Sequence, residues 1–272
     1  MFAEHWFFDF IIYVYAISLL CAFSDLLQAN GRARRLALTL LVAVWLFQTG
    51  YLIWRAYDLF PVLTGVDSLL FYSWALVTFT LVINWFYRMD FVVFAANLVG
   101  FTVLAVHFFV LPDAENARMA EPLLSELVFI HVTMAFLAYA LFSLSAVFAV
   151  LYLVGNHLLK RKKWNQTLRR LPSLGRLQQF SYRLNMSGVP LLILALILGL
   201  IWAYQKVGGG FWYDPKIFGS LLVLLAYSIY LYQRVVKGWN GRRLAWWSLL
   251  SFSTVLLNYL ISNAGLSFHH WL

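Results

Sequence analysis

Residues 127–156 read LVFIHVTMAFLAYALFSLSAVFAVLYLVGN and contain no Asp, Glu, Lys or Arg. A helix needs about 20 predominantly apolar residues to cross the hydrocarbon core of a bilayer, so this stretch predicts a membrane-spanning helix. The whole chain has the same character, because 63% of its 272 residues are hydrophobic and 11% are charged. Soluble domains carry about 25% charged residues, and disordered chains are poor in aromatic residues, which make up 19% of this chain. The composition therefore excludes a water-soluble domain and a disordered chain.

Seven further apolar stretches also have spanning length. The eight predicted spans are residues 6–27, 35–54, 67–87, 91–111, 127–156, 187–205, 215–233 and 244–264. The sequence thus predicts an all-α membrane protein, a polytopic bundle of eight transmembrane helices in a single transmembrane domain that covers residues 1–272. No Lys or Arg precedes the first span and no small-residue cleavage site follows it, so we expect this span to remain as a helix and not to be removed as a signal peptide.

The positions of the charges predict the orientation of the bundle. Sixteen of the twenty Lys and Arg residues fall in the connectors after spans one, three, five and seven, whereas the other connectors are acidic or mixed. Connectors rich in Lys and Arg stay in the cytoplasm. We therefore expect both termini on the outer side, an N-out/C-out arrangement.

The longest connector, residues 157–186, is the one predicted place for a cytoplasmic partner. It carries eight positive charges and no acidic residue. These charges suit anionic lipid headgroups, which is the interpretation we favour, or a soluble acidic partner; we expect no direct nucleic-acid binding. Basic and apolar residues alternate between Trp164 and Arg183, which predicts a short amphipathic helix on the membrane surface.

Histidine is the residue type that points to chemistry. The connectors contain no phosphate loop, dinucleotide fingerprint, nucleophile elbow or His-Glu zinc motif, so we expect a protein that is not an enzyme. Five of the six histidines belong to the outer half of the predicted bundle: His5, His107, His131, His269 and His270. A single interfacial histidine usually only bonds a neighbour. Several at one depth, among aromatic residues and with almost no cysteine or carboxylate, suit the iron of haem better than zinc.

The connector between spans six and seven adds a second signal. Residues 207–216 read VGGGFWYDPK. Three glycines allow the backbone to approach another surface closely, and the consecutive aromatic residues Phe211, Trp212 and Tyr213 predict a flat apolar platform. An ordinary aromatic belt at the membrane interface is the alternative. Asp214 before Pro215 predicts the start of the seventh helix.

From Gly199 to His269 the sequence resembles the cytochrome c assembly (CcsA-type) family of haem-handling membrane proteins. The outer loop of that family carries a Trp-Gly-x-x-Trp-x-Trp-Asp-Pro-Lys-Glu signature, which we align on Asp214-Pro215-Lys216. Two histidines flank the family signature and supply axial ligands to haem. The upstream histidine context is matched by His131-Val132-Thr133-Met134, and the downstream context by Gly265-Leu266-Ser267-Phe268-His269.

The chain also departs from the family pattern. The three family tryptophans, the final glutamate and a histidine inside the membrane fall on Val207, Phe211, Tyr213, Ile217 and Tyr232. Full cytochrome c synthase activity is therefore not expected. The length, the eight-span layout and the segment from Tyr13 to Trp54 resemble the HemX branch of the family, which is associated in bacilli with haem-dependent control of glutamyl-tRNA reductase abundance.

The resemblance implies a protein of the bacterial cell (inner) membrane that binds b-type haem non-covalently and regulates haem biosynthesis. In this reading His131 and His269 ligate the iron, with His107 and His270 in reserve. The aromatic platform and Asp214 complete the site. The implied partners are haem, the bilayer and, through residues 157–186, glutamyl-tRNA reductase. Two alternatives stay open: a carrier that delivers haem for cytochrome c maturation, and a scaffold that has kept the fold and lost haem.

Overall fold

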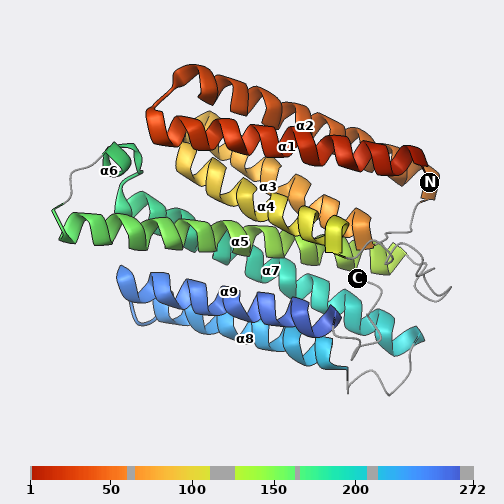
Figure 1. Ribbon diagram of the computed structural model, residues 1–272. Helices are drawn as coiled ribbons and strands as arrows, with labels where there is room; N and C mark the ends of the chain where they lie inside the picture. Colours follow the sequence, from red (N-terminus) through yellow and green to blue (C-terminus); the bar gives the residue numbers. More distant parts are fainter. Residues whose placement is uncertain (1, 60–64, 111–125, 163–165, 207–213, 264–272) are drawn as a thin grey trace.

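The computed structural model describes residues 2–59, 65–110, 126–162, 166–206 and 214–263. Within these ranges the chain is helical and forms no strand. The helices are α1 (Phe2–Gln28), α2 (Gly31–Leu59), α3 (Gly65–Tyr87), α4 (Asp90–Val110), α5 (Glu126–Lys160), α6 (Gln166–Arg170), α7 (Leu174–Lys206), α8 (Pro215–Val235) and α9 (Arg242–Asn263). Apart from the short α6, they run side by side along one long axis (Figure 1). The predicted all-α bundle is confirmed.

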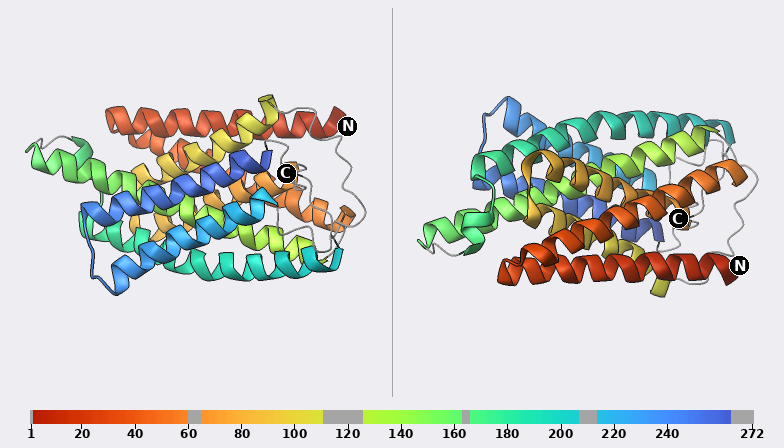
Figure 2. Two further views of the ribbon diagram at one scale, coloured as in Figure 1. Left: turned by 90° about the horizontal axis from the view of Figure 1, so that it is seen from below. Right: turned by 90° about the horizontal axis from the view of Figure 1, so that it is seen from above.

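The number of spans is close to the prediction. Seven helices (α1, α2, α3, α5, α7, α8 and α9) are long and apolar enough to cross a membrane, and α4 is apolar over the shorter stretch Asp90–Val106. These eight helices correspond in order to the eight predicted spans. They alternate in direction, so α1 begins and α9 ends at the same end of the bundle (Figures 1 and 2). This end is termed the outer end after the predicted orientation, which itself stays a prediction.

The start of α7 differs from the prediction. The sixth predicted span begins at residue 187, but α7 begins at Leu174 and continues to Lys206. The expected amphipathic surface helix is instead divided between α6 and the first turns of α7. A proline at position 172 separates the two, because proline cannot continue a preceding helix. The polar first turns of α7 remain helical because they pack on α5: Leu177 is fully buried, and the Ser145 hydroxyl donates to the Ser181 carbonyl at 3.0 Å.

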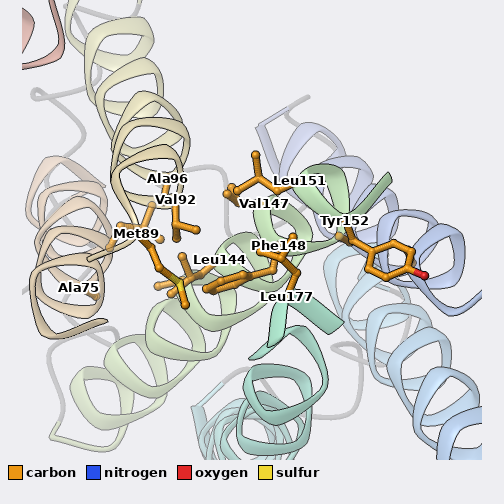
Figure 3. Packing of buried hydrophobic residues seen from close by; sticks show 14 of the residues in the cluster. Ala75, Met89, Val92, Ala96, Leu144, Val147, Phe148, Leu151, Tyr152 and Leu177 are labelled. Carbon is orange, nitrogen blue, oxygen red and sulfur yellow. The ribbon is translucent and has the colours of Figure 1, made fainter. Parts of the chain in front are cut away.

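The central element is α5. In its most apolar window 72% of the residues are buried, against 22–44% in the other six spanning helices. Leu144 and Phe148 of α5 belong to one buried cluster with Met89, at the turn before α4, and Leu177 of α7 (Figure 3). Because α5 is surrounded by helices on several sides, it joins the α1–α4 part of the bundle to the α7–α9 part.

Close packing holds α7 against α5. A Cβ added to Gly188 of α7 would lie 2.5 Å from Cε1 of Phe142 on α5. The other face of the Phe142 ring stacks on Tyr227 of α8, with ring centroids 3.7 Å apart. Small residues allow such close approach between transmembrane helices, where dispersion contacts replace the hydrophobic effect as the source of stability.

Buried polar side chains join the first four helices. Tyr15 of α1 donates its hydroxyl hydrogen to Oδ1 of Asn97 on α4 at 2.8 Å. The Asn97 amide donates in turn to Oγ1 of Thr80 on α3 at 2.9 Å and to the carbonyl of Val93 at 2.8 Å. Since a bilayer interior offers no water to replace these partners, one asparagine fixes the relative positions of three helices.

Asn97→Leu keeps the side-chain volume and removes these hydrogen bonds. We expect the free energy of unfolding to fall by about 1–2 kcal/mol, because interhelical hydrogen bonds in membranes contribute about 0.6 kcal/mol each on average. Unfolding in mixed micelles with increasing SDS, followed by circular dichroism, measures the change. Thr102→Ala on the same helix is the matched control, since the Thr102 hydroxyl bonds only the Leu98 carbonyl one turn away. Equal stability of Asn97→Leu and the wild type would contradict this role.

Candidate functional site

A cavity of about 140 Å³ lies toward the outer end of the bundle, where α5, α7, α8 and α9 meet α3 and α4. It is termed the His131 cavity. Its walls are mostly apolar. The residues that line it are Leu69, Tyr72, Val103, His131, Val132, Ala135, Phe136, Tyr139, Ser143, Leu192, Ala195, Leu196, Lys216, Ser220, Phe252, Val255, Leu256, Asn258 and Tyr259.

His131 stands in the second turn of α5. Its Nδ1 lies 2.6 Å from the backbone carbonyl oxygen of Ala195 on α7. A carbonyl oxygen only accepts hydrogen bonds, so Nδ1 carries a proton and donates it. In the neutral ring, Nε2 then keeps its lone pair. Histidines that bind metals commonly donate their other ring N–H to a backbone carbonyl in this way, which orients the ring and raises its basicity.

The His131 ring lies directly against the backbone of α7 at Gly199. A Cβ added to Gly199 would lie 2.6 Å from Cε1 of the ring and 2.8 Å from Nδ1. No side chain fits between the ring and the helix at such distances. The hydrogen bond to Ala195 therefore depends on a glycine one turn further along α7.

Asp214 caps the first turn of α8. Its backbone is extended, with φ −72° and ψ 124°, and Oδ1 accepts the backbone N–H of Lys216 at 2.8 Å. Pro215 occupies the first helical position, where its missing amide hydrogen is not needed. The predicted start of this helix is confirmed. The Asp214 side chain is buried and serves the helix cap, and it does not line the His131 cavity; its contribution to cofactor binding stays a prediction.

The cavity also contains polar groups that are not among the predicted site residues. Asn258 of α9 donates to the Tyr139 hydroxyl at 3.3 Å and to Oγ of Ser220 at 3.2 Å. The ammonium-bearing side chain of Lys216 lines the same cavity as His131. From the sequence alone, Tyr139, Ser220 and Asn258 would be taken for ordinary interhelical contacts. Lys216 is a charged residue at the start of an apolar span, and this position could have identified it as a candidate site residue.

Most of the other predicted site residues lie outside the described ranges. The aromatic platform of Phe211, Trp212 and Tyr213 and the second predicted ligand, His269, are among them. Both stay predictions.

The reserve ligands are equally untested. His107 belongs to α4 without a described side chain, and His270 also lies outside the described ranges. In the described part of the chain no group of three or more His, Cys, Asp or Glu residues could hold a metal ion. The described site contributes one oriented imidazole, that of His131.

The amino-acid sequence of the chain is similar to those of known proteins. Residues 62–270 match the family model described as Cytochrome C assembly protein. The protein HemX of Bacillus subtilis (strain 168) is 45% identical over 262 residues, which cover 96% of this chain and 95% of the relative. HemX of Brevibacillus brevis is 42% identical over 98% of both chains. The cytochrome c biogenesis protein CcsA of Guillardia theta is 29% identical over 80% of this chain and 79% of the relative.

Gly199→Ala tests the contact between α7 and the His131 ring. The new methyl group would overlap the ring, so we expect a loss of about 1–3 kcal/mol in the free energy of unfolding. Removing the ring in a Gly199→Ala/His131→Ala double variant should abolish most of that loss, because the two changes act on one contact. Gly50→Ala is the control, since a Cβ there meets nothing within 4 Å. If Gly199→Ala lowers the free energy of unfolding equally in the presence and in the absence of the His131 imidazole, the new methyl group does not overlap this ring.

Proposed function

The chain belongs to the cytochrome c assembly protein family, and from this premise we propose that it binds haem non-covalently at the outer end of the bundle and regulates haem biosynthesis. The observation that carries the proposal is the state of His131. Its Nδ1–H is held by the Ala195 carbonyl at 2.6 Å, so Nε2 is the nitrogen available to a metal. The ring also lines an apolar cavity, which suits the neutral imidazole that haem iron requires.

The residues of the cavity fit one side of a haem site. At about 140 Å³ the cavity is smaller than the roughly 300–1,000 Å³ of pockets that enclose drug-sized ligands. In our proposal the described helices would therefore hold one iron ligand, His131, and part of the porphyrin. Phe211, Trp212 and Tyr213 would cover the macrocycle, and His269 would supply the second imidazole. When bound, haem supplies an iron that can carry an electron or report haem abundance, and two imidazoles leave it no open position for oxygen.

The regulatory assignment rests on the overall similarity to HemX. Two HemX proteins match at 42–45% identity over nearly the full chain, well above the 29% for a CcsA protein. We propose that the protein controls the abundance of glutamyl-tRNA reductase in the cytoplasm. The part of the chain available for this is the basic segment between α5 and α7, which includes α6. Its Arg170 binds the carboxylate and the carbonyl of Asp25, at 2.6 and 2.7 Å.

The proposed ligands predict a defined spectrum. Purified protein titrated with ferric haem should give a six-coordinate low-spin absorption spectrum, because two imidazoles form a strong axial field. We expect His131→Ala combined with His269→Ala to abolish that spectrum. His157→Ala is the matched control: His157 lies in the last turn of α5, at the opposite end of the bundle, and its removal should leave the spectrum intact. A double variant with an unchanged spectrum would exclude this pair of ligands.

Haem delivery for cytochrome c maturation is the second candidate function, favoured by the similarity of the chain to cytochrome c biogenesis proteins CcsA. Deletion of the gene separates the two. Under regulation, mature c-type cytochromes, stained for covalent haem, should stay at the wild-type level, while the level of glutamyl-tRNA reductase, followed by immunoblot, should change. Loss of mature c-type cytochromes with constant reductase would favour delivery and overturn the regulatory proposal. Re-expression of the wild-type protein is the control for both readouts.

A further inference from the structure

Lys216 places a basic side chain beside an apolar cavity. It is the second residue of α8, and its side chain lines the His131 cavity. The carboxylate of Asp214, two residues earlier, interacts electrostatically with the ammonium group of Lys216, whereas the direct ion pairs among the described residues involve Arg34, Arg55 and Arg170. The described residues that line the cavity include no Asp or Glu.

A cation in such surroundings favours an anionic partner. Charges removed from water are normally paired, because the loss of hydration is costly and a counter-charge offsets it. Besides the imidazole of His131, the polar groups that share the cavity are the hydroxyls and amide of Tyr72, Tyr139, Ser143, Ser220, Asn258 and Tyr259. All are neutral and several are already bonded to one another. The cavity is therefore charged on one side and complementary to an anionic group on a largely apolar ligand.

The first turn of α8 offers no competing anion site. The backbone N–H of Lys216 is already bonded to the carboxylate of Asp214 at 2.8 Å. A ligand anion would repel that carboxylate at the helix start. The lysine side chain, which lines the cavity, is the donor that remains.

We propose that Lys216 pairs with a propionate carboxylate of the porphyrin and so positions the macrocycle relative to His131. This inference rests on the proposed haem binding and adds a residue that selects the ligand by its charge. His131 would recognise the metal, and Lys216 the acidic edge of the ring. An ammonium–carboxylate hydrogen bond is shorter and stronger than a neutral one, and the apolar walls strengthen it further.

Metal-free protoporphyrin IX tests Lys216 separately from iron ligation. The porphyrin and its dimethyl ester are titrated into protein in nanodiscs of neutral phosphatidylcholine, and binding is followed by porphyrin fluorescence anisotropy, with empty nanodiscs as the background. We expect the wild type to prefer the free acid by about tenfold, which corresponds to about 1.4 kcal/mol. Lys216→Met should reduce the preference to less than about twofold, and Lys216→Arg should keep it because the charge is kept. Lys160→Met, at the exposed end of α5, is the matched control and should behave as the wild type.

The outcomes separate this inference from the haem proposal. Equal affinity of the wild type for acid and ester, or an undiminished preference in Lys216→Met, overturns the role of Lys216. Because the probe contains no iron, His131→Ala should retain the preference for the acid. If that preference holds while the ferric-haem spectrum is independent of His131 and His269, the iron ligands are wrong and the carboxylate contact stands. Failure of the wild type to bind either porphyrin overturns the role of Lys216, whereas the haem proposal is decided by the ferric-haem spectrum.

Discussion

The contact between α5 and α7 is the interaction on which the bundle and the candidate site both depend. Glycines mark it along its length: Gly155 of α5 against the first turn of α7, Gly188 against the Phe142 ring, and Gly199 against the His131 ring. In a bilayer, lipid chains are as apolar as the side chains, so helices associate through close packing and hydrogen bonds. The same closeness that stabilises the pair brings the Ala195 carbonyl within 2.6 Å of His131. The orientation of the imidazole is thus a consequence of helix packing.

The sequence was sufficient to predict the helices that cross the membrane. A bilayer accepts only structures whose backbone polar groups are bonded internally, so the absence of charge over residues 127–156 leaves a helix as the only solution. The sequence was insufficient to predict where α7 begins. Residues 174–186 are polar enough to be taken for a connector, and their helical structure depends on tertiary contacts, such as the burial of Leu177 and the bond from Ser145 to Ser181. Such contacts with α5 leave no periodic signal in a single sequence.

The candidate site was predictable only in part, for a related reason. His131 was found because its residue type, its predicted depth and its match to a family motif agreed. The hydrogen-bond partner of the His131 ring, the Ala195 carbonyl, could not be predicted, because a backbone carbonyl 64 residues away has no residue-specific signature. Lys216 is not among the predicted site residues, since its significance appears only when the cavity beside it is known. The cavity beside His131 is lined by six helices, and a single sequence does not show how these helices are placed relative to one another.

The length of α7 gives the proposed regulation a physical route. A signal that begins with a ligand at the outer end must change contacts at the opposite end, which requires an element in contact with both. Within the described part of the chain, α7 carries Ala195 and Gly199 beside the imidazole and Ser181 in the hydroxyl cluster with Ser145 and Ser248. Its first residues follow α6 directly, where Arg170 ties the basic segment to Asp25 of α1. The helix runs through Pro190, which lies between these two groups of contacts and removes one backbone hydrogen bond there. In the proposed regulation, a displacement of α7 by a ligand at His131 acts through this helix on the contacts of the basic segment, whereas a protein that only delivered haem outside would have no need of this connection.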